Sequence, residues 1–401
     1  MDIRSFFKSN SVLAWIGYTI RQFCYMVMTR FFACILPVDK NKVFFLNFNG
    51  KYGDSPKAVA EYLHLHYPEL RLEWVYSLGS DLIAVPDYIT PVKYETISFF
   101  REMATSRAWV CSKLLPKGTF KRKGQTYIQT WHGDKGFKKF ADDAARELES
   151  YRKRTAGRRF SESEICDWFL TGSEWFVPLI RSAIGYSGKI IKKGVPRNDC
   201  LINISQDKVT AIKSELGIDE NKKIVLYAPT FRDHEASAGS VSFNIDLGKV
   251  TEAMKKKTGD DWICLFRTHP GFQKTVGSND KETRLLDVSS YPDMAELLMI
   301  ADMLITDYSS CAGDFAVKGG FILLYQDDTE SFTSQDRTLY FKMEESPFLV
   351  AHNMEEATAL INGYDVKRVV DNCREICDFY KTCETGDSCR IVSDLILSAG
   401  T

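Results

Sequence analysis

Short apolar runs alternate with stretches of helical periodicity from Lys42 onward. A first series of these runs predicts strands, with helices expected near 56–66 and 96–106: VFFLNFN (43–49), LEWVYSL (72–78), AWVCSKL (108–114), YIQTWHG (127–133) and WFLTGS (168–173). A second series has the same rhythm: KIVLYAPT (223–230), WICLFRTH (262–269), MLITDYS (303–309) and GFILLYQ (320–326). Strands that alternate with helices are typical of βαβ units and a parallel sheet. The pattern therefore predicts two α/β halves.

A turn signal separates the two series. GVPRND (194–199) combines Gly, Pro, Asn and Asp, and the helical stretch 206–216 follows it. We predict a boundary near residue 196, so that 39–195 form a first domain and 196–401 a second, which ends in a helical tail at 366–401.

Residues 1–38 are predicted to form an amphipathic helical segment. Arg21 and Arg30 interrupt its apolar residues, so no uncharged run approaches the ~20 residues that a membrane-spanning helix needs. A polar stripe recurs at spacings typical of a helix: Lys8, Ser11, Tyr18, Gln22 and Thr29. We expect this helix to lie in the interface of an anionic membrane. The same pattern fits a helix packed on the protein's own core, or an uncleaved signal anchor.

Charge and cysteine usage narrow the class of protein. The net charge is −1, yet residues 112–159 hold fourteen Lys and Arg against five Asp and Glu. Such a patch attracts phosphate-bearing ligands or an anionic membrane, although a solvated helical face would also fit. We expect these partners rather than nucleic acid.

The eleven cysteines are scattered and odd in number, which indicates a reducing, cytoplasmic compartment rather than a disulfide framework. The four nearest the C-terminus lack the paired spacing of zinc sites, and we predict no metal: Cys373, Cys377, Cys383 and Cys389.

Polar clusters follow four of the expected strands, where α/β sheets bind their ligands. In TWHGDKG (130–136), His132 stands at the end of a strand, and Gly133 and Gly136 allow a ligand to approach the backbone. The ordinary pKa of histidine, near ~6.5, suits a general base at neutral pH. A hydrogen-bonded turn histidine is the alternative.

Two further clusters carry cationic side chains. APTFRD (228–233) offers Thr230 and Arg232 to phosphate oxygens, although Arg232 could simply pair with the adjacent aspartate. FRTHPG (266–271) carries Arg267 and His269, whose side chains point the same way on a strand and could converge on an anion.

The fourth cluster, LITDYSSCAGDF (304–315), places Ser309 and Ser310 at the start of a helix. Hydroxyls, free backbone N–H groups and the helix dipole make such a position a seat for a diphosphate, although simple capping would explain the serines equally well. Asp307 and Asp314 could bind ribose, base or catalytic groups, or act as caps.

Together the four clusters suit phosphoryl transfer, which depends on positioning and charge neutralisation. No GxGxxG dinucleotide motif, GxxxxGK[ST] loop or nucleophile elbow is present, which argues against dehydrogenases, P-loop NTPases and α/β-hydrolases.

Over roughly residues 43–390 the chain resembles the CDP-glycerol glycerophosphotransferase family, which includes teichoic-acid primases and polymerases and capsule-polymer relatives. The resemblance is carried by several motifs in one order: GKYGDSPKAVAEYL (50–63), QTWHG (129–133), GVPRND (194–199), YAPTFRD, RTHP and TDYSS. It implies a GT-B fold, in which two Rossmann-like domains face each other across a cleft that binds the donor. It also implies a peripheral enzyme of the cytoplasmic face of the cell membrane.

The resemblance further implies the substrates. The donor would be CDP-glycerol or CDP-ribitol, without a cofactor or metal, and the acceptor a lipid-linked or polymeric glycan. The family's motifs assign His132 as the base for the acceptor hydroxyl, His269 and Arg232 to the phosphates, and Ser309 and Ser310 to the diphosphate. The other residues expected to bind substrate are Gly133, Arg197, Thr230, Arg267, Asp307 and Asp314.

Two departures from the family pattern leave the acceptor and the polyol open. Asp134-Lys135-Gly136 stands where many relatives continue Thr-Pro, and Ala312-Gly313 where bulkier apolar residues are common. A GT-B glycosyltransferase that uses a nucleotide sugar, and a membrane-bound scaffold with an inactive transferase fold, are the competing hypotheses.

Overall fold

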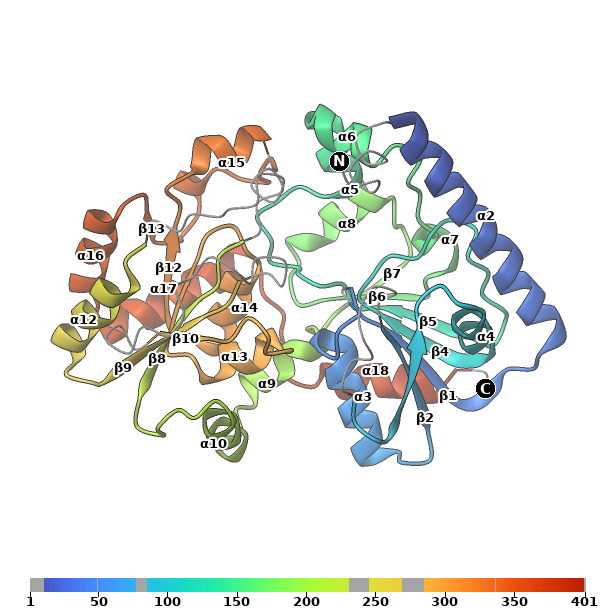
Figure 1. Ribbon diagram of the computed structural model, residues 1–401, viewed down its shortest axis with the longest axis horizontal. Helices are drawn as coiled ribbons and strands as arrows, with labels where there is room; N and C mark the ends of the chain where they lie inside the picture. The colour runs from blue at the N-terminus through green and yellow to red at the C-terminus, as the bar shows by residue number, and fades with distance from the viewer. Residues whose placement is uncertain are drawn as a thin grey trace. The chain divides into compact units, whose positions relative to one another are not determined.

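The computed structural model describes residues 11–48, 50–76, 85–230, 245–268, 285–335 and 337–399. The chain forms two compact units. The first comprises Met1–Asp134, Phe140–Asp199 and Cys383–Thr401, and the second comprises Lys135–Lys139 and Cys200–Thr382. Each contains a parallel sheet covered by helices (Figure 1).

The sheet of the first unit has the order β3-β2-β1-β4-β5-β6-β7, and every neighbouring pair is parallel. Its strands are β1 (Asp39–Leu46), β2 (Arg71–Tyr76), β3 (Ile89–Lys93), β4 (Ser106–Cys111), β5 (Thr126–Gln129), β6 (Trp168–Thr171) and β7 (Lys189–Lys192). The strand order reverses between β1 and β4, which makes their carboxyl ends the topological switch point of this sheet.

Both faces of this sheet are buried, which explains why its strands are continuous apolar runs rather than alternating ones. Val43 and Phe45 point to one face, where α3 (Asp54–His66) and α18 (Ser388–Leu397) cover them. Phe44 and Leu46 point to the other face and pack with residues of α2 (Ser11–Ile35) and α4 (Ile97–Thr105). The remaining helices of this unit are short: α5 (Ala141–Glu147), α6 (Glu149–Arg154), α7 (Glu162–Ile165), α8 (Phe176–Ile184) and the 3-10 turn η1 (Pro196–Asn198).

The sheet of the second unit has the order β10-β9-β8-β11-β12-β13 and is also parallel. Its strands are β8 (Lys223–Tyr227), β9 (Trp262–Phe266), β10 (Leu285–Asp287), β11 (Met303–Thr306), β12 (Phe321–Tyr325) and β13 (Val350–Ala351). Here the order reverses between β8 and β11. Helix α9 (Asp199–Ile202) leads into this unit. The other helices in its described residues are α10 (Gln206–Glu215), α12 (Leu247–Thr258), α13 (Met294–Ile300), α14 (Cys311–Lys318), α15 (Thr329–Gln335), η2 (Met343–Glu345), α16 (Met354–Asn362) and α17 (Val366–Phe379).

The predicted α/β class is confirmed, since the nine predicted apolar runs supply nine of the strands. The course of the C-terminal tail differs from the predicted boundaries, which place all of 196–401 in one domain. Helix α17 belongs to the second unit, whereas residues 383–401 group with the first. The reason is packing, because Val392 and Ile396 of α18 are fully buried in the same cluster as Val59 and Leu63 of α3.

Helix α2 packs on the first unit through its more polar side. Tyr25, Thr29 and Phe32 are buried, and Gln22 Nε2 donates to the backbone oxygen of Gly157 at 3.1 Å. Its outward side exposes large apolar residues: Val12, Trp15, Ile16, Ile20, Phe23, Val27, Phe31 and Ile35. None of the described helices is both long and apolar enough to cross a membrane.

Candidate active site

His132 lies at the switch point of the first sheet. It follows β5, and its Nδ1 is 2.9 Å from the backbone oxygen of Ser112, the residue directly after β4. The aromatic ring of Phe48, which follows β1, stacks on the imidazole at a centroid distance of 4.1 Å. The backbone oxygen after β4 and the aromatic ring after β1 thus fix the imidazole where α/β sheets bind ligands.

This geometry selects the tautomer of His132. A backbone carbonyl can only accept a hydrogen bond, so Nδ1 of the neutral ring carries the proton and donates it to Ser112. The lone pair is then on Nε2. An imidazole held in this way can take a proton from a hydroxyl group, as a general base must.

Strained backbone precedes the histidine. Trp131 has φ = +55°, a region that residues with a side chain seldom adopt and that costs on the order of 1–3 kcal/mol. Its backbone N–H donates to Gln129 Oε1 at 2.9 Å, and its indole Nε1 donates to the oxygen of Gly133 at 3.0 Å. Gly133 therefore helps to shape the loop through its carbonyl group.

A buried network continues from this loop into the core. Gln129 Nε2 donates to the hydroxyl of Tyr127 at 2.9 Å, and that hydroxyl donates to Glu162 Oε1 at 2.8 Å. Burial raises the pKa of Glu162 to about 7, although hydrogen bonds from Leu115 N and from Tyr127 act in the opposite direction. The network thus fixes the side chain of Gln129, and this side chain in turn fixes the backbone of Trp131.

Asp134 and Arg197 are engaged within the first unit. Asp134 is fully buried, and its Oδ2 accepts from the hydroxyl of Thr171 at 2.9 Å and the backbone N–H of Gly172 at 2.5 Å. The guanidinium of Arg197 lies 3.3 Å from Asp54 and 3.8 Å from Asp134. Two carboxylates thus neutralise Arg197, one of the residues predicted to bind substrate.

Asp307 and Thr230 meet at the switch point of the second sheet. Thr230, which follows β8, donates its backbone N–H to both carboxylate oxygens of Asp307, at 2.9 and 3.0 Å. The hydroxyl of Thr306 donates to the oxygen of Ala228 at 2.7 Å. Asp307 therefore fixes the loop after β8.

Arg267 follows β9, the strand next to β8. Burial lowers the pKa of its guanidinium, and its Nη1 is buried without a hydrogen-bond partner among the described residues. A buried guanidinium nitrogen of this kind is costly unless an acceptor reaches it. An anionic ligand at the carboxyl end of the sheet would supply that acceptor.

Ser309 and Ser310 begin α14. Ser310 is the N-cap residue but makes no side-chain capping bond, and Ser309 Oγ only weakly accepts from the N–H of Cys311, at 3.4 Å. Capping therefore uses little of their hydrogen-bonding capacity, which leaves the hydroxyls and the helix N-terminus for an anion.

Asp314, in the first turn of α14, forms a buried ion pair. Its Oδ1 is 3.6 Å from Nζ of Lys135, and both side chains are almost completely inaccessible. Because its carboxylate is buried and paired, Asp314 is less suited to contact a substrate than Ser309 and Ser310 are. Arg232 and His269 fall outside the described residues.

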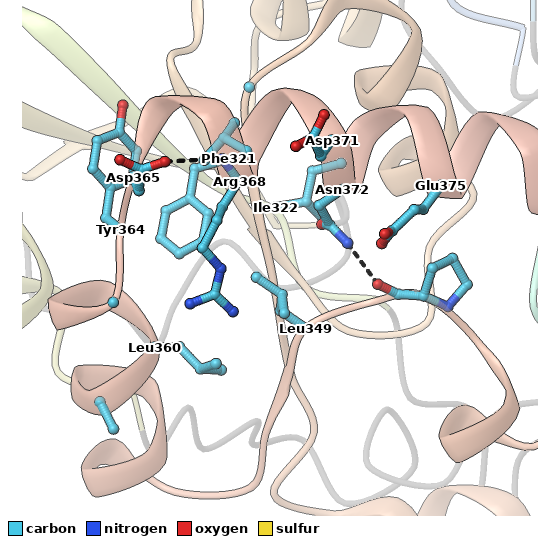
Figure 2. Close-up of a pocket in the computed structure, with 15 residues that line it drawn as sticks. Phe321, Ile322, Leu349, Leu360, Tyr364, Asp365, Arg368, Asp371, Asn372 and Glu375 are labelled. Atoms are coloured by element: carbon cyan, nitrogen blue, oxygen red, sulfur yellow. Dashed lines mark hydrogen bonds between the residues drawn. The ribbon is translucent and has the colours of Figure 1, made fainter.

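One cavity in the second unit is remote from these residues. It has a volume of about 430 Å³ and lies between α17 and the amino ends of β12 and β13, with Phe321, Leu349 and Leu360 in its wall (Figure 2). Asn372 of α17 donates to the oxygen of Pro347 at 2.7 Å across one side of it. Because α/β sheets bind ligands at the carboxyl ends of their strands, we do not place the active site here.

Two parallel Rossmann-like sheets, each with polar residues where its strand order reverses, define a protein of the GT-B fold class. The sequence matches the family described as CDP-Glycerol:Poly(glycerophosphate) glycerophosphotransferase over residues 28–398. The chain belongs to this family.

Individual relatives agree with this assignment. The teichoic acid glycerol-phosphate transferase of Staphylococcus aureus is 31% identical over 344 residues, which cover 84% of this chain and 86% of that protein. The teichoic acid poly(glycerol phosphate) polymerase of Bacillus subtilis is 32% identical over 81% of this chain. This chain spans only 44% of that relative's length. The solved structure of the wall teichoic acid polymerase TagF matches with a TM-score of 0.77 and 26% identity, over 95% of this chain and 97% of the other.

Several residues of the site have no signal in the sequence. Phe48 and Ser112 hold the ring of His132, yet a phenylalanine and a serine after apolar strands are ordinary. Gln129 lies within the QTWHG motif, and only the structure shows that its side chain binds the strained residue two positions later.

Proposed function

We propose that this protein transfers glycerol phosphate from CDP-glycerol to an acceptor hydroxyl with release of CMP, in the synthesis of a teichoic-acid-like or capsular polymer. The observation that carries the proposal is the position of His132, with Nδ1 bound to Ser112 and the ring at the switch point of its sheet. Family membership and the relative in Staphylococcus aureus, which matches over most of both chains, support the choice of donor.

In the proposed reaction, the acceptor oxygen attacks the phosphorus that carries the glycerol. The new P–O bond forms as the bond from this phosphorus to the bridging oxygen breaks, and CMP leaves with that oxygen. Nε2 of His132 takes the proton of the acceptor hydroxyl. Arg232, His269 and Arg267 would neutralise the phosphates, and Ser309 and Ser310 would donate hydrogen bonds to the pyrophosphate from the start of α14.

Product analysis tests this proposal. The protein is incubated with CDP-glycerol, CDP-ribitol or a UDP- or GDP-sugar, each with lipid-linked and polymeric acceptors, and the released nucleotide and the product are identified by mass spectrometry. We expect CMP and an acceptor that is heavier by one glycerol phosphate unit. Release of a nucleoside diphosphate from a sugar donor, without CMP from either CDP-polyol, would reject the proposal in favour of a glycosyltransferase.

We further propose that the protein works at the cytoplasmic face of the cell membrane and binds anionic lipid through α2. Trp15, Ile20 and Phe23 on the outward side of this helix are 54–59% exposed. Exposed basic residues accompany the apolar side chains: Arg30 on α2 itself, and Arg152 and Lys153 on α6, which packs against α2. Apolar side chains flanked by basic ones are the combination that binds a helix to an anionic interface.

A further inference from the structure

A second cavity in the second unit opens at the carboxyl ends of β12 and β13. Its volume is about 460 Å³, and Gln326 and His352, the residues directly after these two strands, both line it. Gln326 Nε2 donates to the backbone oxygen of Asp307 at 2.8 Å. This hydrogen bond connects a residue of the cavity wall to the loop between β11 and α14, which carries Ser309 and Ser310.

The part of the wall formed by residues 338–341 is held in place by backbone pairing. The N–H of Lys139 donates to the oxygen of Thr338, and the N–H of Tyr340 donates to the oxygen of Phe137, each at 2.8 Å. Phe137 is fully buried and packs on Phe341, with ring centroids 5.4 Å apart. The wall is thus anchored without a ligand, as expected of a binding site that is largely preformed.

Two oxygen atoms of residues that line this cavity are buried and have no hydrogen-bond partner within the described part of the chain: Oε1 of Gln326 and Oγ1 of Thr338. The orientation of the Gln326 amide is fixed, because the carbonyl of Asp307 can only accept and must face the NH₂ group. Oε1 is therefore left as an acceptor. Buried polar atoms without partners are uncommon in folded proteins, and each one calls for an explanation.

A polyol matches these two atoms. Its hydroxyl groups can donate to Oε1 of Gln326 and either donate to or accept from the hydroxyl of Thr338. Leu339 and Tyr340 provide apolar surface for the carbon atoms. Lys342 places one positive charge in a lining that also contains Glu344 and Glu345, and it is the side chain that can pair with an attached phosphate. We propose that this cavity binds a glyceryl phosphate group, with Gln326 and Thr338 as its polyol contacts.

This inference rests on the proposed function and specifies where the polyol binds. The group could come from the donor or from the glycerol phosphate end of a growing acceptor. Thr338→Val distinguishes the two sources, since it keeps the shape of the side chain and removes only the hydroxyl. The KM for CDP-glycerol is measured at saturating acceptor, and the KM for a glycerol-phosphate-terminated acceptor at saturating CDP-glycerol.

We expect Thr338→Val to raise one of the two KM values by roughly 3- to 10-fold, the effect of one lost neutral hydrogen bond, with the melting temperature unchanged or higher. A rise in the KM of the acceptor alone assigns the cavity to the acceptor end, and a rise in the KM of CDP-glycerol alone assigns it to the donor. Thr358→Val is the matched control. Thr358 lies on α16, outside the lining of this cavity, and its hydroxyl donates to the oxygen of Met354 at 2.7 Å, so both KM values should stay unchanged.

Direct binding separates this inference from the proposed reaction. Titration with sn-glycerol 3-phosphate, followed by NMR or calorimetry, should show weaker binding to Thr338→Val than to Thr358→Val, even if no CDP-polyol is turned over. Equal binding to the two variants, together with unchanged KM values, would overturn the assignment of the cavity.

Discussion

Nζ of Lys135 lies 3.6 Å from Oδ1 of Asp314, and neither side chain is accessible to solvent beyond 6%. The position of this lysine also explains why residue 313 is a glycine. A Cβ atom at Gly313 would lie only 2.4 Å from Cβ of Lys135. The two departures from the family pattern, Lys135 and Gly313, are therefore one packing arrangement beside the start of α14.

The ion pair predicts non-additive effects on stability. Lys135→Met should lower the free energy of unfolding by about 3–5 kcal/mol, because it leaves the Asp314 carboxylate buried without its cation. Lys135→Met combined with Asp314→Asn should cost much less than the sum of the single variants. Urea denaturation of the two single variants and the double variant measures this coupling, and additive losses would contradict it.

His132 should be essential for turnover but not for donor binding. We expect His132→Ala to lower kcat by ~100-fold or more, with little change in the dissociation constant of CDP-glycerol, because the variant lacks the base for the acceptor hydroxyl. His66→Ala is a suitable control, since His66 is an exposed histidine of the same unit whose ring packs at a tilt against Tyr62. Steady-state kinetics and equilibrium binding are compared for both variants, and full activity in His132→Ala would remove the assigned role.

Glu162 should make the protein less stable as the pH rises. Burial raises the pKa of its carboxyl from 4.5 to about 7, so the folded state holds a proton that the unfolded state releases between these values. Stability is then lost as the pH rises from about 4.5 through about 7, by roughly 3 kcal/mol in total.

Glu162→Gln should reduce this dependence on pH. Burial also raises the pKa of Glu73 to about 7, and this residue is unchanged in the variant. The loss of stability with rising pH should therefore become smaller without disappearing. Melting temperatures of the wild type and the variant at pH 5 and pH 8 test this expectation. An unchanged difference between the two pH values would show that Glu162 does not titrate in this range.

The outward side of α2 should determine membrane binding. Replacing Ile20 and Phe23 by glutamate should weaken binding to anionic liposomes by on the order of 100-fold, because each substitution removes an apolar side chain that would enter the interface. Val366→Glu is the control, since Val366 is 66% exposed but lies on α17 in the second unit. Flotation with liposomes should distinguish the variants, and retained binding of the Ile20 and Phe23 variant would exclude α2 as the anchor.

The sequence predicts the sheets well because burial on both faces makes their central strands continuously apolar. It misses β3, β7, β10 and β13. These are the short, partly exposed edge strands of the two sheets, and an edge strand needs fewer apolar residues than a central one. The strand-end clusters are visible because polar residues interrupt apolar runs.

The side-chain contacts that decide what each site residue does cannot be predicted from local sequence patterns. The pairing of Arg197 with Asp54 and Asp134, or of Lys135 with Asp314, depends on where distant segments meet in three dimensions. Nothing in the local pattern separates Arg197, which is neutralised by carboxylates, from Arg267, which has a buried nitrogen without a partner.

Because α18 covers α3 and the first sheet, the unit that contains His132 is completed by a segment that follows the whole of residues 200–382 in the sequence. During translation, residues 200–382 emerge before the segment that closes the core around Val59 and Leu63. The second unit can therefore fold while the first still exposes apolar surface. Removing α18 would accordingly damage the unit at the other end of the sequence, the one that contains His132.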